Sequence, residues 1–155
     1  SPAEWVTALA YLKARAARDH AGPDALILAA DTVCVLDGRI IGQPRDARHA
    51  AAMITSMADR SHEALTGVCL LDADTGGRTL RHDRAIVQLG PLTPEQIGRY
   101  VASEQWRGKA GAYNYFERLD DGWPLSVRGD PHTVVGLPIR LVRDMLVRHG
   151  SEVAA

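Results

Sequence analysis

The sequence has few of the residues that mark specialised classes of protein. Only two of its 155 residues are cysteines, Cys34 and Cys69, and only 5% are aromatic. Each cysteine lies inside an apolar stretch, and neither has the spacing of a metal-ligand pair. We therefore expect two buried free thiols in a reducing compartment and no disulfide. The six histidines likewise show no paired metal-ligand spacing.

Charge of one sign and long apolar runs are also lacking. Eighteen basic and nineteen acidic residues give a formal net charge of -1. This balance leaves no broad positive surface for a nucleic-acid polymer or an anionic membrane, so neither partner is expected. No apolar run reaches the length of a membrane span, and no basic-then-apolar leader precedes Trp5. We therefore expect a cytoplasmic protein.

Helical and strand-like patterns alternate along the chain, which is 46% hydrophobic. Helical spacing and capping residues predict four helices, at 2–19, 47–59, 94–100 and 134–150. Apolar runs bounded by turns predict five strands, at 25–36, 39–41, 62–74, 79–89 and 123–128. We expect the part at 25–30 to be buried on both faces because it is continuously apolar. This order predicts an α/β domain with a mixed sheet, with no linker to divide it.

Asp31 is the first candidate for a functional residue because it interrupts an apolar run that predicts a strand. Open α/β sheets bind ligands outside the carboxyl ends of their strands, and the pattern places Asp31 at such an end. An aspartate that only caps a turn is an equally good explanation at this stage.

Three further features are ambiguous on pattern alone. Lys13 falls among helical positions that otherwise face inward, so its stem passes along the core or its ammonium reaches a buried anion. Gln43, between Gly42 and Pro44, presents an amide at a bend or simply forms a turn. The loop at 105–116 mixes small and aromatic residues, which suits a ligand pocket and an irregular core equally.

Six short stretches form an ordered series over nearly the whole chain. They are KA at 13–14, AADTV at 29–33, GRIIGQPRD at 38–46, SHEALTGV at 61–68, GKAGAY at 108–113 and VVGLP at 134–138. Any one of them is weak, but their order and spacing together resemble the Maf (septum formation inhibitor) family of nucleotide pyrophosphatases. The resemblance implies a Maf/Ham1-like (ITPase-like) α/β fold, in which an elongated mixed sheet is flanked by helices.

The resemblance also implies a function and assigns residues to it. Such enzymes are typically cytoplasmic homodimers that hydrolyse nucleoside triphosphates to monophosphates and pyrophosphate with Mg²⁺ or Mn²⁺. Asp31 matches the catalytic acid and metal ligand, and Lys13 matches a catalytic lysine that neutralises phosphate charge. Thr32 would bond the water shell of the metal, while Lys109, Tyr113 and Asn114 would close one side of the nucleotide pocket.

The sequence departs from the family pattern at three places. Gln43 stands where the family usually has a phosphate-facing lysine, and Phe116 removes the glutamine of the usual IQG. Over residues 1–155 we also expect the Maf-like domain to lack its N-terminal strand and its SPRR-type phosphate-binding segment. Two interpretations follow: a working pyrophosphatase, or a catalytically impaired remnant that binds nucleotides or partners. A phosphatase with an aspartyl nucleophile is disfavoured because position 33 is valine rather than a second aspartate.

Overall fold

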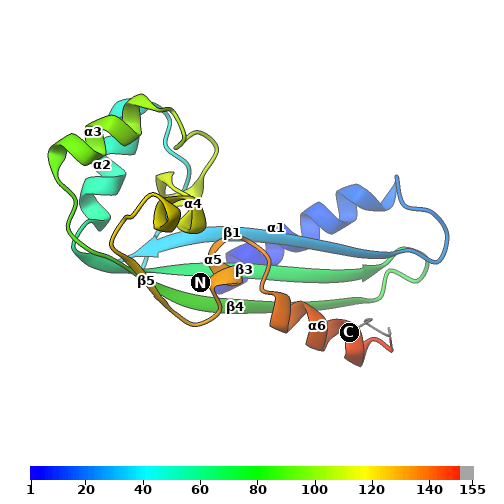
Figure 1. Cartoon of the computed structure of the whole chain (residues 1–155). Coiled ribbons are helices and arrows are strands. Elements are labelled where there is room, and N and C mark those ends of the chain that lie inside the picture. Colours follow the sequence, from blue (N-terminus) through cyan, green and yellow to red (C-terminus); the bar gives the residue numbers. More distant parts are fainter. Residues whose placement is uncertain (151–155) are drawn as a thin grey trace.

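A single five-stranded sheet, flanked by helices, forms the centre of the molecule (Figure 1). The computed structural model describes residues 1–150, so the last five positions of the predicted domain lie outside the described residues. The elements are α1 (Pro2–Arg18), β1 (Leu26–Leu36), β2 (Arg39–Ile41), α2 (Ala47–Met57), β3 (Arg60–Asp72), β4 (Arg78–Leu89), α3 (Pro94–Ala102), the 3₁₀ turn η1 (Ala110–Ala112), α4 (Tyr115–Asp120), β5 (Leu125–Arg128), α5 (Pro131–Val134) and α6 (Ile139–Arg148). No helix within residues 1–150 has the length and apolarity needed to cross a membrane.

The strand order is β2-β1-β3-β4-β5, and every pairing within the described residues is antiparallel. The α/β class and the flanking helices are confirmed, but the prediction of a mixed sheet was wrong in strand direction. Two of the four pairings are hairpins, and tight turns reverse the chain. Asp37 and Gly38 join β1 to β2 with φ values of 50° and 74°, as a type I′ turn requires.

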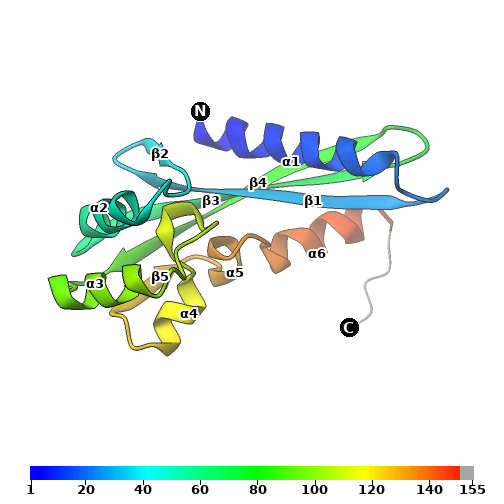
Figure 2. The ribbon, with the colours of Figure 1, turned by 90° about the horizontal axis from the view of Figure 1, so that it is seen from above.

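Helices cover both faces of β3, the central strand. Cys69 and Leu71 pack against α1 on one face, and Val68 and Leu70 pack against α6 on the other. Figure 2 shows these two helices running along opposite sides of the long strands. The strand buried on both faces is thus β3, whereas Leu28 in the part of β1 predicted to be so is 41% exposed. β3 is buried on both faces because it lies in the middle of the sheet, and an apolar sequence alone does not produce this burial.

The first helix lies unusually close to the sheet. A Cβ at Gly67 of β3 would stand 2.4 Å from backbone atoms of Val6, so only glycine fits there. The buried face of α1 accordingly consists of small side chains, namely Val6, Ala10 and Ala14. Trp5 is 54% exposed although its helical spacing matched this face. Close approach of the two backbones selects small residues over large ones.

The C-terminal part of the chain differs most from the prediction. Of the helix expected over 134–150, only α6 (Ile139–Arg148) forms. The preceding short helix α5 already ends at Val134, because Gly136 has a φ of 103° and Pro138 precedes α6. The loop expected over 105–116 contains η1, and it ends in α4, whose N-cap is Asn114. These short elements pack against the sheet, η1 against β1, α4 against β5, and α5 against β3 and β4 (Figure 2).

Candidate functional site

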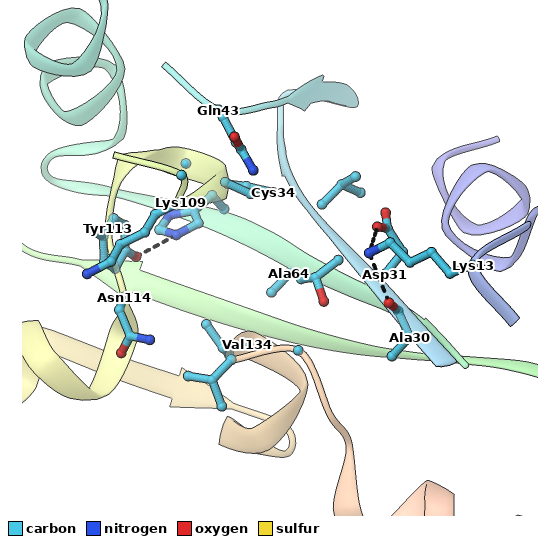
Figure 3. Close-up of a pocket in the computed structure, with 18 residues that line it drawn as sticks. Lys13, Ala30, Asp31, Cys34, Gln43, Ala64, Lys109, Tyr113, Asn114 and Val134 are labelled. Carbon is cyan, nitrogen blue, oxygen red and sulfur yellow. Dashed lines mark hydrogen bonds and ion pairs between the residues drawn. The ribbon is translucent and has the colours of Figure 1, made fainter. Parts of the chain in front are cut away.

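A cavity of about 370 Å³ brings together side chains from six separate parts of the chain. All seven residues predicted from the sequence line it: Lys13, Asp31, Thr32, Gln43, Lys109, Tyr113 and Asn114. Figure 3 shows Asp31 and Lys13 at one side of this cavity, Lys109, Tyr113 and Asn114 at the other, and Gln43 between them. Its size falls in the range of small-molecule sites. The structure thus brings the predicted residues together, while their individual roles stay predictions.

Asp31 and Lys13 form an ion pair at this cavity. The Lys13 ammonium lies 2.5 Å from Asp31 Oδ1 and also donates a hydrogen bond of 3.2 Å to the Ala30 carbonyl. The Asp31 side chain is 16% exposed and that of Lys13 is 58% exposed. Of the two explanations for Lys13, the structure therefore supports an ammonium that reaches a mostly buried anion. Asp31 itself lies in the middle of β1, paired with Gly67, and not at a strand end as predicted.

The cavity extends across an open edge of the sheet. From Leu26 to Val33, β1 has no strand paired on its outer side within the described residues, because β2 pairs only with residues 34–36. Successive side chains of a strand point to opposite faces. Asp31 therefore meets α1 on one face, whereas Thr32 meets Thr66 on the other. Both can line one cavity because no neighbouring strand separates the two faces there.

The Thr32 hydroxyl has a defined orientation. Thr66 donates its single hydroxyl hydrogen to the Thr133 carbonyl at 2.6 Å. Thr32 must therefore be the donor in its 2.7 Å hydrogen bond with Thr66. Only acceptor capacity remains on the Thr32 oxygen. This suits a bound water better than an anionic phosphate oxygen.

Sequence reasoning did not assign His62 and Cys34 to the site, although both line the cavity. His62 Nε2 and the Tyr113 hydroxyl are hydrogen-bonded at 2.7 Å, and the Nδ1 atom of His62 is buried without a partner in the described residues. Burial lowers the pKa of His62 to about 4 and raises the pKa of Tyr113 well above 10. Burial also raises the pKa of Cys34 to about 12, so its thiol stays protonated and is no nucleophile. Side chains two residues apart in a strand share a face, so His62 lies on the same face of β3 as Thr66. This alternation is the signal in the sequence that could identify His62.

A glycine contact joins the two loops that carry the remaining residues. The Gly111 amide donates to the Gly42 carbonyl at 3.1 Å, which fixes the loop of Lys109 beside that of Gln43. Gly111 has a φ of 69°, and a Cβ there would stand 3.2 Å from Cys34. Figure 3 shows the Gln43 amide pointing into the cavity.

The far side of the cavity is held by α4. Asn114 accepts a hydrogen bond of 3.2 Å from the Glu117 amide and so caps this helix. Glu117 in turn forms an ion pair with Lys109. Figure 3 shows the Lys109 ammonium on the side away from Asp31 and Lys13. Asn114 and Lys109, both predicted to bind substrate, therefore already have partners within the chain.

The cavity offers few protein ligands to a divalent cation. Asp31 is the one carboxylate on the cavity wall within the described part of the chain. Residues 1–150 contain no group of three His, Cys, Asp or Glu side chains able to hold a metal by themselves. Mg²⁺ is commonly bound by one or two carboxylates together with substrate phosphates and water. The donor set fits an ion that arrives with a polyphosphate, not a permanent protein-bound metal.

Comparison with known proteins gives a consistent picture. The chain matches the family model described as Maf-like protein over residues 1–149. It is 40% identical over 150 residues to a protein of Symbiobacterium thermophilum, covering 97% of this chain and 75% of the relative. It is 42% identical over 141 residues to one of Salinibacter ruber, covering 90% and 68%. It is 41% identical over 155 residues to one of Moorella thermoacetica, covering 98% and 77%. All three relatives are named dTTP/UTP pyrophosphatase. The family match and the identity to these relatives both show that the chain belongs to the Maf family.

Proposed function

We propose that this protein is a nucleoside triphosphate pyrophosphatase that cleaves dTTP and UTP to the monophosphate and pyrophosphate. The observation that carries the proposal is the Lys13–Asp31 pair on the wall of a cavity of about 370 Å³. It lies in a chain about 40% identical to relatives named for this activity. The relatives favour this enzyme over a remnant that only binds.

The reaction needs water to attack the α-phosphorus in line with the departing pyrophosphate. A carboxylate can orient that water and accept its proton, and Asp31 is the carboxylate on the cavity wall in the described residues. The Lys13 ammonium beside it would offset the charge of the phosphates. The Thr32 oxygen, which has only acceptor capacity left, would hold the water in place.

The opposite side of the cavity would hold the nucleoside. Tyr113 is fixed by His62, so its ring presents a rigid apolar surface, and Asn114 retains its amide NH₂ group as a donor. Gln43 points into the cavity between the two sides and can donate to a phosphate without adding charge.

We also propose Mg²⁺ or Mn²⁺ as the cofactor, held by Asp31 on the protein side. Such an ion supplies Lewis-acid polarisation of the phosphoryl oxygens. A reducing, cytoplasmic location agrees with two cysteines that are both buried and unpaired. A homodimer remains our expectation from the family, and light scattering of the purified protein measures it directly.

The experiment is an assay of pyrophosphate release by the purified chain with Mg²⁺. Its substrates are dTTP, UTP, CTP, GTP and 7-methyl-GTP. We expect the two 4-oxo pyrimidine substrates to turn over faster than the others. Phosphate released singly, without pyrophosphate, would reject cleavage at the α-phosphorus. A folded chain that binds dTTP without cleaving it would support the binding remnant instead.

A further inference from the structure

The balance of charge in the cavity is the feature that the proposed function leaves unexplained. Lys13 and Lys109 are the two lysines on its wall, and no arginine lines it within the described residues. Lys13 is paired with Asp31, which belongs to the site itself. Lys109 is paired with Glu117, which does not line this cavity. Both lysines on the wall of this cavity are therefore already paired with carboxylates in the described residues.

The Lys109–Glu117 pair draws the ammonium out of the cavity. Figure 3 shows the Lys109 side chain running along the wall toward Asn114, with its ammonium on the side away from Asp31. There it also lines a neighbouring surface hollow, together with Glu117 and Arg118. The Lys109 side chain is 24% exposed and that of Glu117 is 47% exposed. Because water reaches the half-exposed Glu117 carboxylate, the pair is screened and an incoming anion can compete for the ammonium.

The position of Glu117 depends on α4. Asn114 caps the helix, and its bond to the Glu117 amide places that residue in the first turn, on the side of Lys109. Arg118 NH2 lies 3.9 Å from Glu117 Oε2, and Arg118 NH1 lies 2.7 Å from Asp121. Arg118 is almost fully buried and stacks over Tyr100. Arg118 would thus keep Asp121 as a partner if Glu117 lost its charge, so its buried guanidinium would not be left unpaired.

We propose that Glu117 is a positioning residue that holds Lys109 out of the cavity and thereby opposes binding of the polyphosphate tail. A bound triphosphate must displace the Glu117 carboxylate from the Lys109 ammonium. The loss of this ion pair offsets part of the favourable interaction between Lys109 and the triphosphate. This inference rests on the proposed function only in taking a polyphosphate as the ligand.

The test is calorimetric binding of inorganic triphosphate in Mg²⁺ buffer at low salt. Glu117→Gln keeps the shape of the side chain and removes its charge. We expect it to lower the Kd by about two- to fivefold, the range set by the strength of exposed ion pairs. Lys109→Met should raise the Kd. In the double variant, removal of the Glu117 charge should have no further effect because Lys109 is gone. The gain should shrink at high salt.

Glu104→Gln is the matched control, because Glu104 also pairs with a cation, Arg107, at 2.6 Å but lies outside the cavity. An equal gain in this control would show a general effect of net charge and overturn the proposal. So would an unchanged or higher Kd for Glu117→Gln, or an undiminished gain in the Lys109→Met background. Should Glu117→Gln unfold, Glu117→Ala provides the same comparison.

Turnover of UTP, measured separately, distinguishes this inference from the proposed function. The predicted changes in triphosphate affinity without pyrophosphate release would support the role of Glu117 and reject the proposed activity. Pyrophosphate release by the wild type with no triphosphate binding in any variant would reject the role of Glu117 alone.

Discussion

Asp31→Asn is the sharpest test of the proposed mechanism. The substitution keeps the size of the side chain but removes its charge and its capacity to accept a proton from water. Loss of one electrostatic group of this kind typically lowers turnover by about 10²-fold or more. The cost in stability should be small, about 1 kcal/mol or less, because the partner Lys13 is more than half exposed and returns to water.

The assay is the initial rate of pyrophosphate release from UTP with Mg²⁺, accompanied by thermal unfolding of each variant. Asp37→Asn is the control, because Asp37 also pairs with a cation, Arg60, at 2.6 Å but lies in the β1–β2 turn, outside the cavity. We expect the control to keep its turnover. A rate for Asp31→Asn within about threefold of the wild type, in a folded protein, would refute a catalytic role for this carboxylate.

Three further predictions concern other parts of the structure. Gln43→Lys should lower the KM for UTP at low salt and less so at high salt, since it restores a cation that points into the cavity; an unchanged KM would place this side chain away from phosphate. Gly67→Ala should destabilise the protein by about 1–3 kcal/mol in urea unfolding, because its Cβ would stand 2.4 Å from the Val6 backbone. Burial lowers the pKa of His62 to about 4, so between about pH 6.5 and pH 4 the unfolded chain binds a proton that the folded chain does not. The free energy of unfolding should fall by up to about 3 kcal/mol as the pH drops through that window, and His62→Gln should flatten this fall.

The features predicted best from the sequence depend on residues a few positions apart. The capping residues that predicted three of the helices are Ser1 and Thr93, which form capping boxes, and Asp46, which caps α2. The turn at Asp37 and Gly38 also follows from its two residues alone. Such interactions are local, so neither strand pairing nor tertiary packing was needed to find them.

Features set by partners distant in the chain were predicted less well. The direction of the strands depends on which strands pair, and no local pattern distinguishes a mixed sheet from the antiparallel sheet. Helical spacing in α1 matched Trp5 to the buried face, but Gly67 brings the backbones so close that only small residues fit. The family motifs indicated seven residues that do line the cavity. The partners of Lys109 and Tyr113, which are Glu117 and His62, appeared only with the fold.

The placement of Asp31 beside Thr32 shows why the site itself needed the structure. Adjacent residues of a strand face opposite sides of the sheet, so alternation alone would assign these two side chains to different surfaces. Here the outer side of β1 is unpaired up to Val33 in the described residues, and the cavity wraps around that edge. Lys13 can therefore reach both the Asp31 carboxylate and the Ala30 carbonyl. The open edge thus brings a carboxylate and an ammonium from the α1 face into one cavity with the Thr32 hydroxyl from the opposite face.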